Sequence, residues 1–161
     1  MNRPVIIGFG NTLRGDDGAG VHVAQRVAAE IGGVDVITVQ ELTPELAPSL
    51  TGRDLVIFVD ASTRVPHLSV GAVEPAAEPL RHADHALLPA DIVSLCGGLF
   101  PPAPRSALLI EVPAFNCAFG ETLSPAVDRM VELSVAMIRD LLAGTPAADA
   151  PGLPAAGSLP D

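Results

Sequence analysis

Residues 5–20 read VIIGFGNTLRGDDGAG, and the rest of the chain is organised around them. The apolar run Val5–Ile7 predicts a buried strand. The sequence Gly-Phe-Gly-Asn then forces a tight turn, and Asp16 and Asp17 follow inside a glycine-rich frame. From Val21 onward the apolar residues take helical spacing. The stretch therefore predicts a strand, a loop with two carboxylates and a helix. In parallel α/β proteins such a loop lies at the carboxyl end of a strand, where functional sites collect.

The same stretch partly fits the dinucleotide-binding fingerprint G-x-G-x-x-G. Gly8 and Gly10 match it, but Leu13 occupies the position of the third glycine. The two neighbouring acids would also repel a pyrophosphate bound to this loop. Glu41 is the one residue that favours the fingerprint, because it lies about where a ribose-binding acid would fall. We therefore expect a cation at this loop, with a nucleotide- or metabolite-binding α/β protein as the alternative.

Length and composition limit the class of protein. The chain has 161 residues, which is enough for one domain with a real core, and 48% of them are hydrophobic. Its formal net charge of −10 argues against a nucleic-acid partner and against an anionic membrane surface. A strand is predicted almost at the N-terminus, which leaves no room for a signal peptide. No apolar run approaches membrane-spanning length, so we expect a soluble, cytoplasmic protein.

The two cysteines, Cys96 and Cys117, provide neither a disulfide framework nor a metal-ligand spacing. We expect them to be buried free thiols in a reducing compartment. The sequence also lacks the G-x-S-x-G and H-E-x-x-H motifs. The usual hydrolytic nucleophiles are therefore not indicated, and the catalytic group is left unassigned.

Hydrophobic patterning predicts strands alternating with helices. Residues 1–143 should form one domain, and residues 144–161, rich in Ala, Pro and Gly, a disordered tail. Long loops are expected at 74–88 and 113–123. The expected strands are 4–8, 34–39, 54–59, 107–112 and a weaker edge strand at 68–73. The expected helices are 19–31, a short one from Pro44, 88–95 ended by Gly97-Gly98, and a last one that begins at Ser124-Pro125 and runs to about Leu142.

This alternation implies an α/β fold whose sheet carries helices on both faces. Right-handed crossovers favour the strand order 2-1-3, in which the first and third strands are neighbours. Asp60 follows the third strand. It should therefore emerge beside the loop that carries Asp16 and Asp17, which is a reason from topology to pair these acids.

Converging carboxylates have three readings: a general acid and base, metal ligands completed by an imidazole, or caps of turns and helix starts. For Asp16 the structural role is favoured. For Asp17 a functional role and a structural role both stay open, because the residue could be a ligand or could cap the following helix. For Asp60 a functional role is favoured, since a turn at the end of this strand does not require an acid.

A third ligand must come from a loop. The candidates are His67, His82, Asp84 and His85. His22 lies on the first predicted helix and is expected to be a surface residue.

The segment GFGNTLRGDDGAG at 8–20 resembles the opening motif of nickel–iron hydrogenase maturation endopeptidases. The resemblance covers about residues 4–143. It continues through QELTPEL at 40–46, LVIFVDA at 55–61, His85 with Leu88 and Asp91 after it, and GETLSP at 120–125. It departs at Asp17, where many members have Glu, and at 113–119, which does not align.

The resemblance implies a three-layer α/β sandwich with a mostly parallel mixed sheet. It also implies an endopeptidase, a hydrolase that removes the C-terminal extension from a hydrogenase large-subunit precursor after nickel has been inserted. Asp17, Asp60 and His85 would bind the nickel that the precursor carries, and no organic cofactor is implied. Asp91, six residues after His85, favours His85 over His82 as the ligand. A metal-binding protein that escorts the large subunit without cutting it is a further hypothesis.

Overall fold

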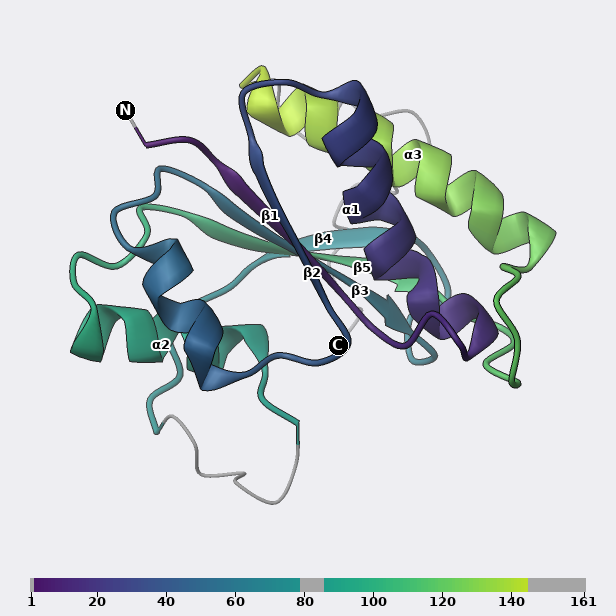
Figure 1. Ribbon diagram of the computed structural model, residues 1–161, viewed down its shortest axis with the longest axis horizontal. Helices are drawn as coiled ribbons and strands as arrows, with labels where there is room; N and C mark the ends of the chain where they lie inside the picture. Colours follow the sequence, from purple (N-terminus) through teal and green to yellow (C-terminus); the bar gives the residue numbers. More distant parts are fainter. Residues whose placement is uncertain (1, 79–85, 145–161) are drawn as a thin grey trace, which may run out of the picture.

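The computed structural model describes residues 2–78 and 86–144, and Figure 1 shows its three layers. Its strands are β1 (Val5–Phe9), β2 (Asp35–Val39), β3 (Val56–Ser62), β4 (Ser69–Ala72) and β5 (Ala107–Pro113). Its α-helices are α1 (Ala19–Glu30), α2 (Pro89–Leu99) and α3 (Pro125–Leu142). Two 3₁₀ helices, η1 (Gly15–Gly18) and η2 (Pro44–Leu50), complete the described elements. The predicted disordered tail beyond Gly144 lies outside the described residues, as does much of the loop predicted at 74–88.

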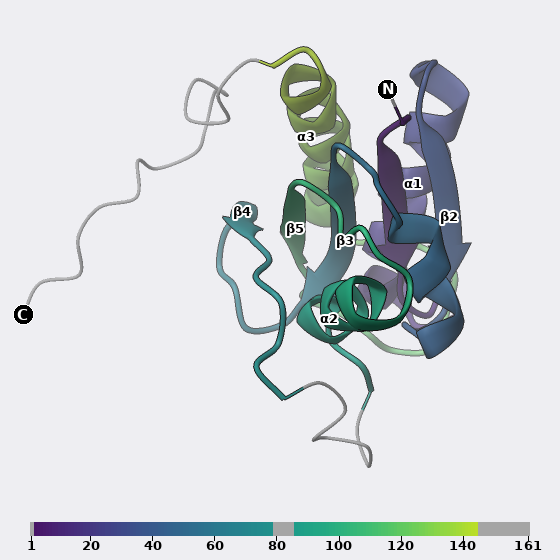
Figure 2. The ribbon, with the colours of Figure 1, turned by 90° about the vertical axis from the view of Figure 1, so that its left-hand side faces the viewer.

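The described strands form one sheet in the order β2-β1-β3-β5-β4. The first four of these strands are parallel, and β4 pairs antiparallel with β5. Figure 2 shows β4 and β2 at opposite edges of the sheet. The predicted order 2-1-3, the mostly parallel mixed sheet and the weak edge strand are all confirmed.

The sheet separates two hydrophobic clusters, because alternate residues of a strand point to opposite faces. On one face Ile6, Ile57 and Ile110 pack with α1 and α3. On the other face Ile7 and Phe58 pack with α2 and η2. Helices on both faces are therefore confirmed. The central strands β1, β3 and β5 contain apolar runs because both of their faces are covered, whereas the edge strand β2 is only partly buried.

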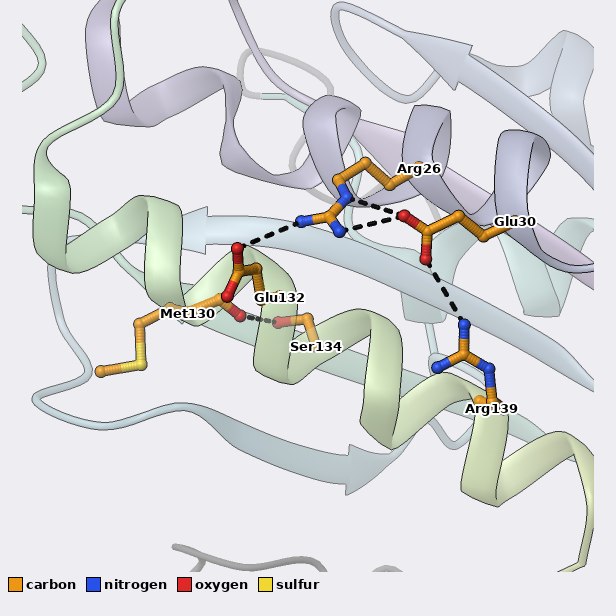
Figure 3. A network of polar contacts seen from close by, with 6 residues as sticks. All are labelled: Arg26, Glu30, Met130, Glu132, Ser134 and Arg139. Carbon is orange, nitrogen blue, oxygen red and sulfur yellow. Dashed lines mark hydrogen bonds and ion pairs between the residues drawn. The ribbon is translucent and has the colours of Figure 1, made fainter.

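Helices α1 and α3 lie side by side on one face of the sheet, and ion pairs between their side chains connect them at the surface (Figure 3). Arg26 pairs with Glu30 in the next turn of α1 at 3.0 Å, and Arg139 of α3 reaches the same carboxylate at 3.4 Å. Arg26 also approaches Glu132 at 4.0 Å. These groups are exposed, so the buried valines beneath them contribute most of the stability of this helix pair.

Two predicted boundaries are wrong. Helix α2 does not end before Gly97-Gly98 but runs through both glycines to Leu99. Each glycine weakens a helix by only about 1 kcal/mol, and the Phe100 N–H closes the last turn across both by donating to the Cys96 carbonyl at 2.8 Å. The third strand extends to Ser62, so Asp60 lies within β3 and pairs in register with Glu111 of β5.

No helix in residues 2–78 and 86–144 is both long enough and apolar enough to cross a bilayer.

Candidate functional site

Two glycines place the loop after β1 directly on the carboxyl ends of two strands. A Cβ atom added at Gly20 would lie 2.2 Å from the carbonyl oxygen of Val59 and 2.8 Å from that of Phe9. A Cβ atom at Gly8 would lie 2.3 Å from the carbonyl oxygen of Gly20. Only residues without a side chain allow the first turn of α1 to approach β1 and β3 this closely. The glycine frame of the motif therefore brings η1 against β3.

Asp17 lies in η1 and is half-buried. Its Oδ2 accepts the backbone N–H of Asn11 at 2.8 Å, which ties the carboxylate to the turn after β1. Gly10 makes this turn with φ +140, and a Cβ atom there would lie 2.1 Å from the carbonyl oxygen of Asp17. Asp17 does not cap α1, because the N-cap residue is Gly18. The sequence left Asp17 either a functional role or a role as helix cap, and the structure excludes the helix cap.

Asp60 lies on β3 beside η1 and is half-buried. Burial raises the pKa of its carboxyl group most, and the charges of Asp17 and then Glu111 raise it further, against a hydrogen bond from the Ala61 N–H. The resulting pKa is about 7, compared with an ordinary value of 3.8. This effect agrees with the packing at Gly20, which brings the loop of Asp17 against the end of β3 that carries Asp60. The structure thus brings Asp17 and Asp60 to the same edge of the sheet.

Carboxyl groups held close together repel each other when both are ionised, and a bound cation relieves that repulsion. The pair could also exchange a proton near neutral pH. Within the described residues no three His, Cys, Asp or Glu side chains come together as a set that could hold a metal ion. His85, the third predicted ligand, lies outside the described residues, as do His82 and Asp84. His67 is exposed, and His22 is half-buried on α1.

Asp16, next to Asp17, has the structural role predicted for it. Its carboxylate is fully buried and accepts four hydrogen bonds, so it joins the start of α1 to a segment more than 90 residues away. The donors are the backbone N–H groups of Phe115, Asn116 and Ser124 and the hydroxyl of Ser124, at 2.7–3.0 Å. Burial alone would raise the pKa of Asp16, but the hydrogen bonds outweigh burial and lower it.

Two features of this edge were missed from the sequence. Ser124 stands at the predicted N-cap position of α3, yet its hydroxyl donates to Asp16 and not to the helix. Glu111 lies opposite Asp60 and adds to the negative charge there. An acid near the end of the apolar run ALLIEV was the signal for Glu111.

The loop after β1 uses its backbone N–H groups internally, unlike a phosphate-binding loop. The Asn11 N–H donates to Asp17, and the N–H groups of Leu13 and Arg14 donate to the side-chain and backbone oxygens of Asn11 at 2.9 and 3.1 Å. A phosphate cradle needs such donors free and aimed at the ligand. Glu41, the acid that favoured a dinucleotide, is exposed. These contacts count against the nucleotide-binding alternative.

Comparison with solved structures finds the same fold in hydrogenase maturation proteases. The hydrogenase maturating endopeptidase HybD from E. coli aligns with a TM-score of 0.71 at 19% identity, over 89% of this chain and 93% of that protein. The NiFe hydrogenase maturation protease HycI from Thermococcus kodakarensis aligns with a TM-score of 0.65 at 25% identity, over 88% and 92%. HybD from the same archaeon aligns with a TM-score of 0.66 at 24% identity, over 87% and 99%.

Neither the protein-family models nor the curated proteins yield a match to this sequence. The structural matches cover 87–89% of this chain and 92–99% of the solved proteins. They confirm the predicted α/β fold. They also confirm, at the level of the fold, the resemblance to the maturation proteases that the motif at 8–20 indicates.

Proposed function

We propose that this chain is an endopeptidase that removes the C-terminal extension from the precursor of a nickel–iron hydrogenase large subunit. The observation that carries the proposal is the close packing of η1, which carries Asp17, against the carboxyl end of β3, which carries Asp60. The motif that contains Asp17 resembles that of the maturation proteases, and solved proteases of that name share the fold. The motif, the fold and the paired carboxylates point to the same activity.

In this proposal the nickel in the precursor is part of the substrate and serves as the recognition signal. Asp17, Asp60 and His85 complete its coordination, while the precursor supplies the other ligands. Carboxylate and imidazole ligands suit a borderline divalent ion, and nickel ranks high in the Irving–Williams order for such ligands. An incomplete ligand set in the protease leaves room for the ligands of the precursor. Only a nickel-loaded precursor would then bind productively.

His85 is compatible with this arrangement through its position in the chain. It precedes α2 by a few residues, and α2 packs on the sheet face that contains Phe58. Asp60 is two residues after Phe58 on β3, so by alternation it points to that same face. Asp91, whose spacing favours His85 over His82, is buried in α2 and accepts the Leu88 N–H at 2.8 Å. It fixes where α2 begins.

The test is cleavage of the nickel-loaded precursor by the parent and by Asp60→Ala, followed by mass spectrometry of the precursor. Loss of a ligand should lower the cleavage rate at least about 100-fold, because even the loss of a group that only orients a ligand costs 10–100-fold. Asp128→Ala, which removes an exposed carboxylate from α3, is the matched control and should cleave at the parent rate. Nickel-free precursor should remain uncut.

Three outcomes would contradict the proposal. If Asp60→Ala cleaves at the parent rate, this acid does not recognise the substrate. If the parent cuts nickel-free precursor equally well, nickel is not the signal. If the parent binds the precursor without changing its mass, the chain is an escort protein and not a protease.

A further inference from the structure

Three large apolar side chains are exposed beside the Asp17–Asp60 edge. Phe119 is 89% exposed, Phe115 is 62% exposed and Leu13 is 47% exposed. Phenylalanine is among the residues most often buried, so two exposed phenylalanines in one five-residue stretch are unusual. Exposed apolar groups gathered at one place on a soluble protein mark a surface that contacts another molecule.

The backbone that presents these side chains is held rigidly. The buried carboxylate of Asp16 accepts the N–H groups of Phe115 and Asn116, and the Asp16 N–H donates back to the Asn116 carbonyl at 2.9 Å. Gly120, next to Phe119, exchanges hydrogen bonds of 2.8 Å with the backbone of Leu13 and Gly15. The three side chains therefore come from two loops clamped to each other.

Gly15 allows this clamp. It has φ +53, and a Cβ atom there would lie 2.6 Å from the carbonyl oxygen of Asn116. Within the second loop, the side-chain oxygen of Asn116 accepts the Ala118 N–H at 3.0 Å. A loop fixed in this way loses little conformational entropy when it binds, and such preorganisation favours affinity.

The clamped loops lie next to the candidate site. The Ala114 N–H donates to the carbonyl of Ser62 at 2.9 Å, two residues after Asp60 on β3. Cys117 lies between the two phenylalanines and is half-buried. Burial raises the pKa of its thiol, and the charge of Asp17 raises it further, so Cys117 lies near Asp17. A molecule bound at Asp17 and Asp60 would have this apolar surface beside it.

We propose that Leu13, Phe115 and Phe119 form a docking surface, here called the aromatic rim, for an apolar patch on the body of the polypeptide cleaved at the Asp17–Asp60 edge. This inference rests on the proposed function. A second copy of this chain is a poorer occupant, because two molecules that each carry a net charge of −10 repel each other. The rim holds the folded part of the substrate while its C-terminal extension enters the site.

The test uses the double variant Phe115→Ser/Phe119→Ser in the full chain with nickel-loaded precursor. Exposed aromatic anchors dominate binding, so KM should rise at least about tenfold while kcat stays within about twofold of the parent. The thermal midpoint should change little, since both side chains are solvent-exposed. The matched control is Leu99→Ser/Leu133→Ser, which removes exposed leucines (67% and 43%) from α2 and α3. Its KM should equal that of the parent.

An unchanged KM in the phenylalanine variant would overturn the aromatic rim while leaving the protease proposal intact, provided that the parent cleaves. An equal rise in the leucine control would also overturn it, because any exposed apolar group would then suffice. Concentration-dependent self-association of the parent, lost in the phenylalanine variant with KM unchanged, would assign the surface to a second copy. A parent that never cleaves the precursor would refute the proposed function, and the rim would lose its occupant with it.

Discussion

Asp16 and Asp60 lie at the same edge of the sheet and differ in almost every physical respect. Asp16 is fully buried, yet four donors surround its carboxylate and lower its pKa. Asp60 is only half-buried, but burial and the nearby charges of Asp17 and Glu111 raise its pKa to about 7. A carboxylate surrounded by hydrogen-bond donors is part of the structure, whereas one surrounded by acids is available to a cation. The environment distinguishes the two roles, since the residue type is the same.

The largest expected effect comes from breaking the Asp16 cluster. Asp16→Asn keeps the shape but turns an amide NH₂ toward donors that need an acceptor. We expect a loss of about 3 kcal/mol in the free energy of unfolding at pH 7, or roughly 10 °C in thermal midpoint. Because the pKa of Asp16 is lowered by folding, its contribution is present above pH 3.8 and is lost as the pH falls through the folded-state pKa.

Thermal melts of parent and Asp16→Asn across pH 3–7 measure this, with Asp128→Asn as a control carboxylate exposed on α3. The gap between parent and variant should narrow toward acid pH. Equal melting temperatures of parent and Asp16→Asn at pH 7 would show that the four hydrogen bonds contribute no net stability.

The contribution of Asp60 to the free energy of unfolding should depend on pH in the opposite direction. Between pH 3.8 and about 7 the folded, metal-free protein retains a proton that the unfolded chain has released, so its stability falls as the pH rises through this window. Asp60→Asn removes that loss. We expect the variant to be more stable than the parent by about 2 kcal/mol at pH 8 and no more stable near pH 4.

Urea unfolding in the presence of a chelator, at pH 4, 6 and 8, gives these free energies. A variant that is less stable than the parent at pH 8 would show that ionised Asp60 is well solvated, and the contrast with Asp16 would be lost.

The smallest expected effect separates the contributions of neighbouring acids to the raised pKa of Asp60. Burial contributes most to the raised pKa, followed by Asp17 and then Glu111. In an Asp17→Asn background, the stabilisation by Asp60→Asn at pH 8 should shrink by about 1 kcal/mol. In a Glu111→Gln background it should shrink less. The double-mutant cycles give both coupling energies, and a larger coupling to Glu111 would reverse the assignment.

Local patterning and topology were sufficient to predict much of this edge. The apolar runs located β1, β3 and β5, and the handedness of crossovers placed β1 between β2 and β3. The sequence alone therefore pairs Asp60 with the loop of Asp17. The structural role of Asp16 also followed from sequence, because an acid between glycines is typical of turns.

Long-range contacts could not be predicted. No local pattern indicates that Asp16 bonds to Phe115 and Ser124, about 100 residues later. Helix α2 continues through two glycines, where helix propensity alone predicts that it ends. The role of His85 remains a prediction, as does the metal itself.

The bonds from Asp16 to Asn116 and Ser124 also bear on the order of folding. During synthesis the first loop emerges early, but the donors for its buried carboxylate do not exist until the chain has been extended past residue 124. Contacts between residues so far apart in the sequence form late, since a long loop must close before these contacts can stabilise the chain. The loop that carries Asp16 and Asp17 therefore gains these hydrogen bonds only after β5 and the start of α3 have docked. A nascent chain that has not reached that length has the carboxylates of the site without their final arrangement.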